Sequence, residues 1–163
     1  LASLNGKERL LDLFCGVGNL SLVLALRAGE VVGIENHPAA VAAAVENAAR
    51  NGIGNALFHR GDANEIPEDK PFDVAVLDPP REGAYDAIKG LLRLRPEKIL
   101  YVSCNPTTLA RDLIPLTHGG YEVVHARVFD FFPQTFHIEG CVCLRRQCGE
   151  NDYGFGSSKN TSC

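Results

Sequence analysis

The chain has 163 residues, of which 45% are hydrophobic, and it carries a formal net charge of -4. This length predicts one domain with a single hydrophobic core. The acidic balance excludes a uniformly basic, nucleic-acid-coating protein, and no apolar run approaches the roughly 18 residues that a membrane-spanning helix needs. We therefore expect a soluble, cytoplasmic domain with no membrane partner.

The charge is unevenly distributed along the chain. Residues 1–75 carry six Lys and Arg against ten Asp and Glu, whereas residues 76–163 carry ten of each. A nucleic acid would therefore be contacted by the second half or by segments outside this sequence. The absence of methionine predicts a piece of a longer protein. Six cysteines in a domain of this size predict reduced thiols rather than a disulfide framework.

Strand-like and helix-like segments alternate from residue 9 to residue 120. Buried strands are predicted at residues 9–14, 31–35, 56–61, 72–78 and 98–104, and helices at residues 19–29, 38–52, 85–94 and 106–120. This alternation is typical of βαβ units and predicts a Rossmann-like α/β fold, with a mostly parallel sheet and helices on both faces.

The alternation stops after Gly120. Residues 121–131 and 136–146 predict two strands with no helix between them, so the seven-stranded sheet should end in an antiparallel pair. Residues 147–163 are polar, rich in Gly and Ser, and without periodicity. We interpret them as a tail outside the folded domain of residues 1–146.

A glycine turn follows the first predicted strand, in the sequence LLDLFCGVGNLSL of residues 10–22. Gly16 and Gly18 allow a tight turn whose backbone can approach a ligand, and the helix that follows adds N–H donors. A simple tight turn would need the same glycines. Glu35 ends the next strand with the spacing expected of a carboxylate that accepts from ribose hydroxyls, the alternative being an exposed strand-end charge.

The third strand ends at Asp62, which could accept from an adenine amino group or could cap a helix. Ser21 stands where a dinucleotide-binding turn usually has its third glycine, and this disfavours a pyrophosphate-containing cofactor. Together with the final antiparallel pair, the pattern resembles the Rossmann-like S-adenosylmethionine-dependent methyltransferases. The resemblance implies S-adenosyl-L-methionine as the cofactor.

Asp78 ends the fourth strand, at the carboxyl edge where open α/β sheets bind ligands. Methyltransferases of amino groups that look similar have an aromatic residue directly after the Pro79–Pro80 pair. This chain has Arg81 there. An exocyclic amine is therefore a less suitable target than a carbon atom.

Cys104 follows the fifth strand at the same edge. Carbon 5 of a pyrimidine is a poor nucleophile, and its methylation requires a thiolate bonded to carbon 6. Asn105 and Pro106 have the sequence of a helix cap and a first helical residue, and the helix N-terminus should favour the thiolate and lower the thiol pKa. The alternative is that Cys104 is a small buried hydrophobic residue.

A base must also remove the proton from carbon 5 after methyl transfer. Glu139 lies in an otherwise apolar predicted strand, where an unneeded charge would be costly, although a structural ion pair remains an alternative. His137, two residues earlier, could orient this base or form a structural hydrogen bond.

These strings, DLFCGVGNLSL, LDPPREG, ILYVSCNPTTLARD and FDFFPQTFHIE, resemble in order and spacing the catalytic domain of the RNA uracil-5-methyltransferases over about residues 9–146. The resemblance implies that Cys104 attacks uracil carbon 6 and that Glu139 is the base at carbon 5. It also implies cofactor contacts at Phe14, Asn19, Glu35, Asp62 and Asp78. The string SCNPTTLARD is closer to the ribosomal-RNA branch than to the transfer-RNA branch, so RNA is the expected partner.

Some family features have no counterpart in this sequence. The glutamine-bearing cofactor segment would precede residue 10, and neither an RNA-binding domain nor an iron–sulfur motif is recognisable. Cys141 and Cys143 alternate along one strand and are interpreted as packing residues rather than metal ligands. Arg81, Arg111 and Arg127 are candidate phosphate contacts. Three other classes stay open: a cytosine-5 RNA methyltransferase, a nicotinamide-dependent oxidoreductase, and a non-catalytic binding module.

Overall fold

A computed structural model describes residues 4–66, 70–130, 133–134 and 138–147 of the chain. The strands are β1 (Arg9–Leu13), β2 (Glu30–Glu35), β3 (Ala56–Arg60), β4 (Val74–Leu77), β5 (Lys98–Ser103), β6 (Tyr121–Phe129) and β7 (Glu139–Arg146). The helices are α1 (Asn19–Ala25), α2 (Pro38–Arg50), α3 (Tyr85–Leu94) and α4 (Pro106–His118). Among the described residues, no helix combines the length and hydrophobicity that crossing a bilayer requires.

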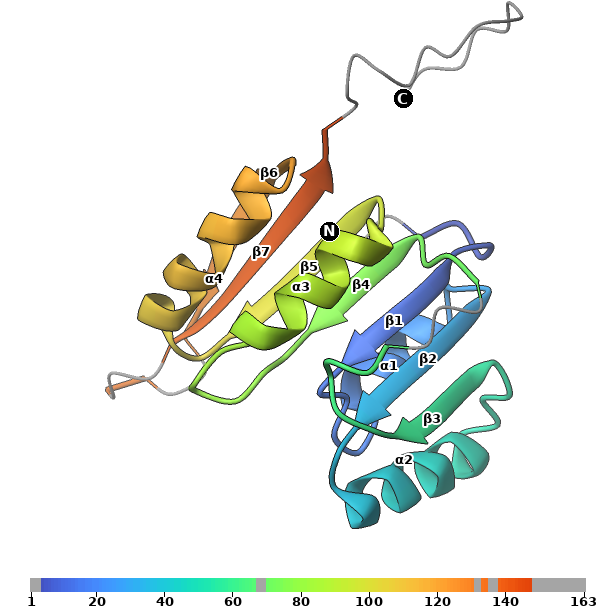
Figure 1. The fold of residues 1–163 in the computed structure, drawn as a ribbon. Coiled ribbons are helices and arrows are strands. Elements are labelled where there is room, and N and C mark those ends of the chain that lie inside the picture. The colour runs from blue at the N-terminus through green and yellow to red at the C-terminus, as the bar shows by residue number, and fades with distance from the viewer. Residues whose placement is uncertain (1–3, 67–69, 131–132, 135–137, 148–163) are drawn as a thin grey trace, which may run out of the picture.

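The seven strands form one sheet in the order β3-β2-β1-β4-β5-β7-β6. The first five strands are parallel, and β7 lies between β5 and β6, antiparallel to both. The predicted seven-stranded, mostly parallel sheet with an antiparallel end is thus confirmed. Figure 1 shows α3 and α4 on one face of the sheet and α1 behind it.

Strand side chains alternate between two apolar cores because successive residues point to opposite faces. On the side of α3 and α4, Leu11 and Leu13 pack with Leu77 and Tyr101, and all four side chains are fully buried. On the side of α1, Leu10 packs with Ala25, Val74 and Val76. The continuous apolar runs of β1 and β4 are therefore those of central strands covered on both faces.

The first helix is shorter than predicted, because it ends at Ala25 rather than near Gly29. Leu26, the residue after the helix, is 73% accessible, so the apolar run does not continue a buried stripe. The chain then returns to the sheet, where the N–H of Gly29 donates to the carbonyl of Glu8 at 2.9 Å. A Cβ at Gly29 would lie 2.9 Å from the carbonyl oxygen of Lys7, so this close approach requires glycine.

One carboxyl group is buried inside the sheet. Asp12, in β1, has no accessible surface, and the hydroxyl of Ser21 in α1 donates to its Oδ2. Burial raises the pKa of Asp12 to about 7; the Ser21 hydrogen bond opposes this shift and the negative charge of Asp78 adds to it. Ser21, which stands in place of a third glycine, therefore connects α1 to β1.

This raised pKa predicts a pH-dependent stability. Between the ordinary carboxyl pKa of 3.8 and a folded value of about 7, the folded chain binds more protons than the unfolded chain. The contribution of protonated Asp12 to the free energy of unfolding is thus complete below pH 3.8 and is lost as the pH rises through about 7. Asp12→Asn removes this loss, so the free energy of unfolding of the variant relative to wild type should rise by about 3 kcal/mol between pH 4 and pH 7.

Urea denaturation of both proteins at the two pH values measures this difference. Glu46→Gln is a matched control, because Glu46 lies on α2 in an exposed pair with Arg50. Its stability relative to wild type should change by less than about 0.5 kcal/mol over the same range. A pH-independent difference for Asp12→Asn would contradict the prediction.

Candidate functional site

The predicted site residues gather at one edge of the sheet. The glycine turn follows β1, Glu35 ends β2, Asp62 follows β3, Asp78 follows β4 and Cys104 follows β5. Since these strands are parallel and adjacent, their carboxyl ends meet at the same edge. The placement predicted for this group is confirmed.

The glycine turn is held by the neighbouring strand. Gly16 and Gly18 have φ angles of 53° and 88°, and a Cβ at Gly18 would lie 3.1 Å from the ring of Phe58. Glu35 accepts from the N–H of Gly16 at 3.1 Å and from that of His37 at 2.8 Å. The carboxylate predicted to bind a ribose thus also fixes the turn. This second role arises because β1 and β2 are paired, and the spacing of Gly16 and Glu35 along the sequence does not predict it.

Phe14 separates two small pockets. It has a φ of 62°, a left-handed conformation that is uncommon for a bulky residue and is found mainly at functional sites. One pocket, of about 120 Å³, is lined by Phe14, Gly16, Asn19 and Asp78 together with Asp12. The other, of about 50 Å³, is lined by Phe14, Glu35 and Asp62 among others. Every residue predicted to bind the cofactor lines one of these pockets except Gly18.

Asp12 is a site residue that the sequence reasoning missed. It lines the larger pocket, and its Oδ1 atom is buried without a hydrogen-bond partner among the described residues. A buried acceptor without a partner is costly, so such an atom marks a place where a ligand or water donates. The available signal was an aspartate within an otherwise apolar strand directly before the glycine turn.

The acidic side chains at this edge influence each other. The protein desolvates Asp78 and raises its pKa, although part of the side chain is solvent-accessible, and the negative charge of Glu139 raises it further. Asp78 in turn raises the pKa of Asp12. Asp12 and Asp78 also line the same pocket, so two carboxyl groups border a space where a cationic ligand would be favoured.

The turn that holds Cys104 is built as predicted. Asn105 is the N-cap of α4, and its Oδ1 accepts from the N–H groups of Thr107 at 3.0 Å and Thr108 at 3.4 Å. Pro106 occupies the first helical turn. The N–H of Asn105 donates to the hydroxyl of Ser103 at 3.1 Å. Cys104 lies between Ser103 and Asn105 at the carboxyl edge of the sheet. Its side chain is half-buried and is therefore not enclosed in the core.

The pairing of β5 with β7 brings Glu139 to the edge of the sheet that holds Cys104. Ser103, the last residue of β5, pairs with Gly140, so Cys104 directly follows this pair and Glu139 directly precedes it. Val142 packs on the side of α3 and α4, and the alternation along β7 therefore places Glu139 on the side of α1. The side chain of His137 lies outside the described residues.

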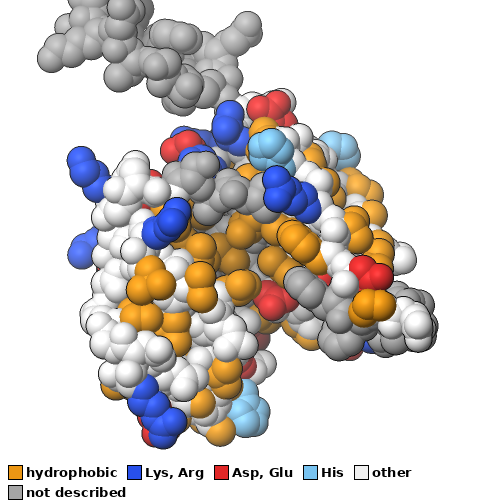
Figure 2. All heavy atoms as spheres, turned by 180° about the vertical axis from the view of Figure 1, so that it is seen from behind, with side chains coloured by type: hydrophobic (Ala, Val, Ile, Leu, Met, Phe, Trp, Pro, Cys, Tyr) orange, Lys and Arg blue, Asp and Glu red, His pale blue; other side chains and the backbone are white. Residues whose placement is uncertain are grey.

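Figure 2 views this side of the molecule. Hydrophobic side chains gather around a hollow that contains acidic atoms, and Lys and Arg side chains lie above it. The site is therefore a depression on the α1 side of the sheet, with apolar walls and a charged rim, as is common for ligand pockets.

Three other expectations can be compared with the structure. Asp62 accepts from the N–H of Asn64, and no helix follows it among residues 61–66 and 70–73, so the helix-cap alternative is wrong. Arg111, considered as a phosphate contact, forms an ion pair with Asp112, and its contact with phosphate stays a prediction. Cys141 and Cys143 are buried and form no disulfide among the described residues, as expected of packing residues.

The sequence profile of the tRNA (Uracil-5-)-methyltransferase family matches residues 2–147. A 23S rRNA (uracil(1939)-C(5))-methyltransferase RlmD of Shewanella amazonensis is 50% identical over 137 residues, which are 82% of this chain and 31% of that protein. The chain thus spans about a third of the length of the curated relatives it matches.

Solved structures agree with this likeness. The tRNA (uracil-54, C5)-methyltransferase of Pyrococcus abyssi, in complex with S-adenosyl-L-homocysteine, is 35% identical with a TM-score of 0.77, over 88% of this chain and 36% of that one. A putative RNA methyltransferase of Pyrococcus horikoshii, 18% identical with a TM-score of 0.72 over 88% and 78% of the two chains, shows the same fold. With the profile matched over nearly the whole folded part, this chain belongs to the tRNA (uracil-5-)-methyltransferase family.

Proposed function

We propose that the protein methylates carbon 5 of a uridine in RNA with S-adenosyl-L-methionine, that ribosomal RNA is favoured over transfer RNA, and that the reaction takes place in the cytoplasm. Residues 1–146 would form the catalytic domain. The observation that carries the proposal is the β5–β7 register, which ends with the Ser103–Gly140 pair and so brings the half-buried thiol of Cys104 and the carboxylate of Glu139 to the same edge of the sheet. The ribosomal choice rests on the relatives at 46–50% identity, which are named for 23S rRNA.

The residues of the edge fit this cofactor. Its sulfonium and ammonium groups are cationic, and the carboxyl groups of Asp12 and Asp78 line one pocket at this edge, where they would favour a cation. The described residues offer no donor to the buried Oδ1 of Asp12, and an ammonium group or a bound water would supply one. Phe14 offers an aromatic wall between the two pockets, and Glu35 and Asp62 line the pocket suited to a ribose and an adenine. When bound, the cofactor supplies an electrophilic methyl group.

The chemistry begins at Cys104. Its thiolate adds to carbon 6 of the uracil, which makes carbon 5 nucleophilic enough to take the methyl group. Glu139 then accepts the proton that carbon 5 still carries, the double bond between carbons 5 and 6 re-forms, and the thiolate leaves. The products are 5-methyluridine and S-adenosylhomocysteine. The uridine must be unstacked from the RNA to reach Cys104, because carbon 6 is covered within a stack.

A second candidate function is cofactor binding without methyl transfer by this part of the protein alone. The length comparison favours it, since about two thirds of the relatives' length lies outside the matched region. Calorimetry with S-adenosylhomocysteine, followed by a methyl-transfer assay on 23S rRNA, distinguishes the two. A cytosine-5 RNA methyltransferase is less consistent with this sequence. Enzymes of that class look to have a cysteine beside the proline that follows the fourth strand, and this chain has Asp78 at that position.

Cys104→Ala tests the nucleophile. RNA containing 5-fluorouridine should form a stable covalent complex with the wild-type protein, because fluorine cannot leave carbon 5 as a proton does. The substitution should abolish the complex on denaturing gels and lower methyl transfer at least ~10⁴-fold, as expected for loss of a covalent nucleophile. Cys143→Ala, in a buried packing position, serves as the control and should retain the complex. A complex that persists in Cys104→Ala would exclude this nucleophile.

Glu139→Gln tests the base, and the expected result differs. Addition and methylation should still occur, while proton removal slows, so a covalent complex should accumulate with unmodified RNA. We expect methyl-product release to fall by about 10²- to 10⁴-fold. The complex is measured by denaturing gel and mass spectrometry. Turnover at the wild-type rate would remove Glu139 from the mechanism.

A further inference from the structure

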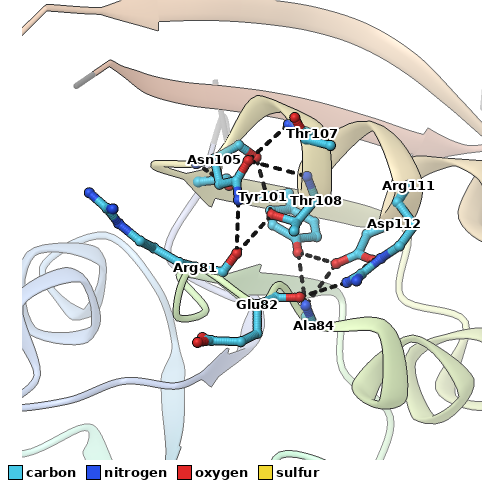
Figure 3. A network of polar contacts seen from close by, with 10 residues as sticks. Arg81, Glu82, Ala84, Tyr101, Asn105, Thr107, Thr108, Arg111 and Asp112 are labelled. Carbon is cyan, nitrogen blue, oxygen red and sulfur yellow. Dashed lines mark hydrogen bonds and ion pairs between the residues drawn. The ribbon is translucent and has the colours of Figure 1, made fainter. Parts of the chain in front are cut away.

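The loop after β4 is bound to the start of α4. Its backbone carbonyl at Arg81 accepts two hydrogen bonds, from Nδ2 of Asn105 at 3.1 Å and from the hydroxyl of Thr108 at 3.2 Å. Figure 3 shows both bonds converging on this carbonyl, while the side chain of Arg81 points away from them. Asn105 therefore caps its own helix with one side-chain atom and holds the loop with the other.

Asp112 connects the same loop to β5 and α4. It is fully buried, and its Oδ2 accepts from the N–H of Ala84 and from the hydroxyl of Tyr101, each at 2.7 Å. Its Oδ1 accepts from Nε of Arg111 at 2.8 Å. The same guanidinium donates through Nη2 to the carbonyl of Glu82 at 2.7 Å. One carboxylate thus joins a strand, a helix and a loop (Figure 3).

The loop also packs directly against this carboxylate. Gly83 has a φ of 85°, and a Cβ there would lie 2.5 Å from Oδ2 of Asp112 and 2.6 Å from Nη2 of Arg111. Only glycine fits both this conformation and this approach. The strings LDPPREG and SCNPTTLARD, which are well separated in the sequence, are therefore one hydrogen-bonded unit.

This unit lies between the two parts of the proposed reaction site. The loop starts from Asp78, in the larger pocket, and α4 starts directly after Cys104. If the loop and the helix separate, the thiol moves relative to Asp78 and the pocket. Misplacement by about 1 Å is enough to lower the rate of a positioned reaction about 10²-fold.

We propose that Asp112 is a positioning residue, which sets the place of Cys104 relative to the Asp78 loop through Tyr101, Arg111 and the backbone of residues 82–84. The inference rests on the proposed function for its catalytic consequence. The geometric part, that Asp112 fixes Cys104, does not depend on it. Asp112 itself contacts neither substrate nor cofactor in this scheme, because its two oxygens are occupied by protein donors.

The test uses the full-length protein with Asp112→Asn, Tyr101→Phe and Thr108→Val. Asp112→Asn turns one acceptor into a donor that faces Arg111. Tyr101→Phe removes a hydroxyl that donates to Asp112 and accepts from the N–H of Ala84, and Thr108→Val removes one that lies within hydrogen-bond distance of the carbonyls of Arg81 and Asn105. Both variants keep the side-chain shape, so they remain informative if Asp112→Asn fails to fold. Glu46→Gln is the matched control, because it neutralises a carboxylate paired with an arginine on the exposed face of α2.

Two readouts separate position from function. The first is the rate of alkylation of Cys104 by iodoacetamide, followed by mass spectrometry on the tryptic peptide 99–111, whose one cysteine is Cys104. We expect Asp112→Asn to change this rate at least threefold. The second is covalent complex formation with a 23S rRNA transcript containing 5-fluorouridine. Here we expect a fall of about 10²-fold for Asp112→Asn and about tenfold for the other two variants.

The KM for RNA and the Kd for S-adenosylhomocysteine should stay within about threefold of wild type. General destabilisation would weaken binding as well as complex formation, so unchanged binding distinguishes a positioning role from it. If Asp112→Asn, or Tyr101→Phe where the former does not fold, leaves both the alkylation rate and complex formation unchanged, the positioning role is overturned. If wild type forms no complex with the transcript, the proposed function fails, and the alkylation rates alone decide the inference.

Discussion

The antiparallel pairing of β7 with β5 is the constraint on which the site depends. Because β7 runs opposite to the other central strands, it starts at the carboxyl edge, where its second residue, Gly140, pairs with the last residue of β5, Ser103. A parallel final strand in the same place would put Glu139 at the other end of the sheet. The antiparallel direction of β7 therefore places a carboxylate at an edge where otherwise only the carboxyl ends of parallel strands lie.

Several carboxyl groups share this edge, and their surroundings differ. Glu35 accepts from two backbone N–H groups and holds the glycine turn, whereas Asp12 is buried against Ser21, and its second oxygen has no partner within the described part of the chain. Asp78 is partly accessible, and both burial and the negative charge of Glu139 raise its pKa. The same side-chain chemistry thus serves a structural bond, a buried acceptor and an open pocket wall, because burial and neighbours differ at each place.

Much of the fold could be read from the sequence because its signals are local. Periodicity indicates the strands and helices, and Asn105 and Pro106 mark a helix start that the structure confirms. The first helix was predicted too long, because apolar residues such as Leu26 continue the pattern although they are exposed. Hydrophobicity alone does not reveal that a chain must turn back early to reach its next strand.

The sequence predicted which residues lie at the site better than it predicted the hydrogen bonds that join them. Residues at strand ends follow from the parallel topology, but the bonds of Asp112 to Tyr101 and Ala84 join segments that meet only after the sheet has formed. The pairing of Asp12 with Ser21 is of the same kind. No propensity of either residue indicates such a partner, since the partner is chosen by packing.

The place of β7 also has a consequence for how the protein is made. β6 is synthesised before β7, yet its pairing partner in the sheet is β7, which separates it from β5. On the ribosome, β6 therefore emerges before its partner in the finished sheet, and the edge of β5 lacks that partner until residues 139–146 arrive. The thiol is thus present early in biogenesis while its carboxylate partner is added by the last strand, so the nascent chain has no assembled site until this sheet is complete.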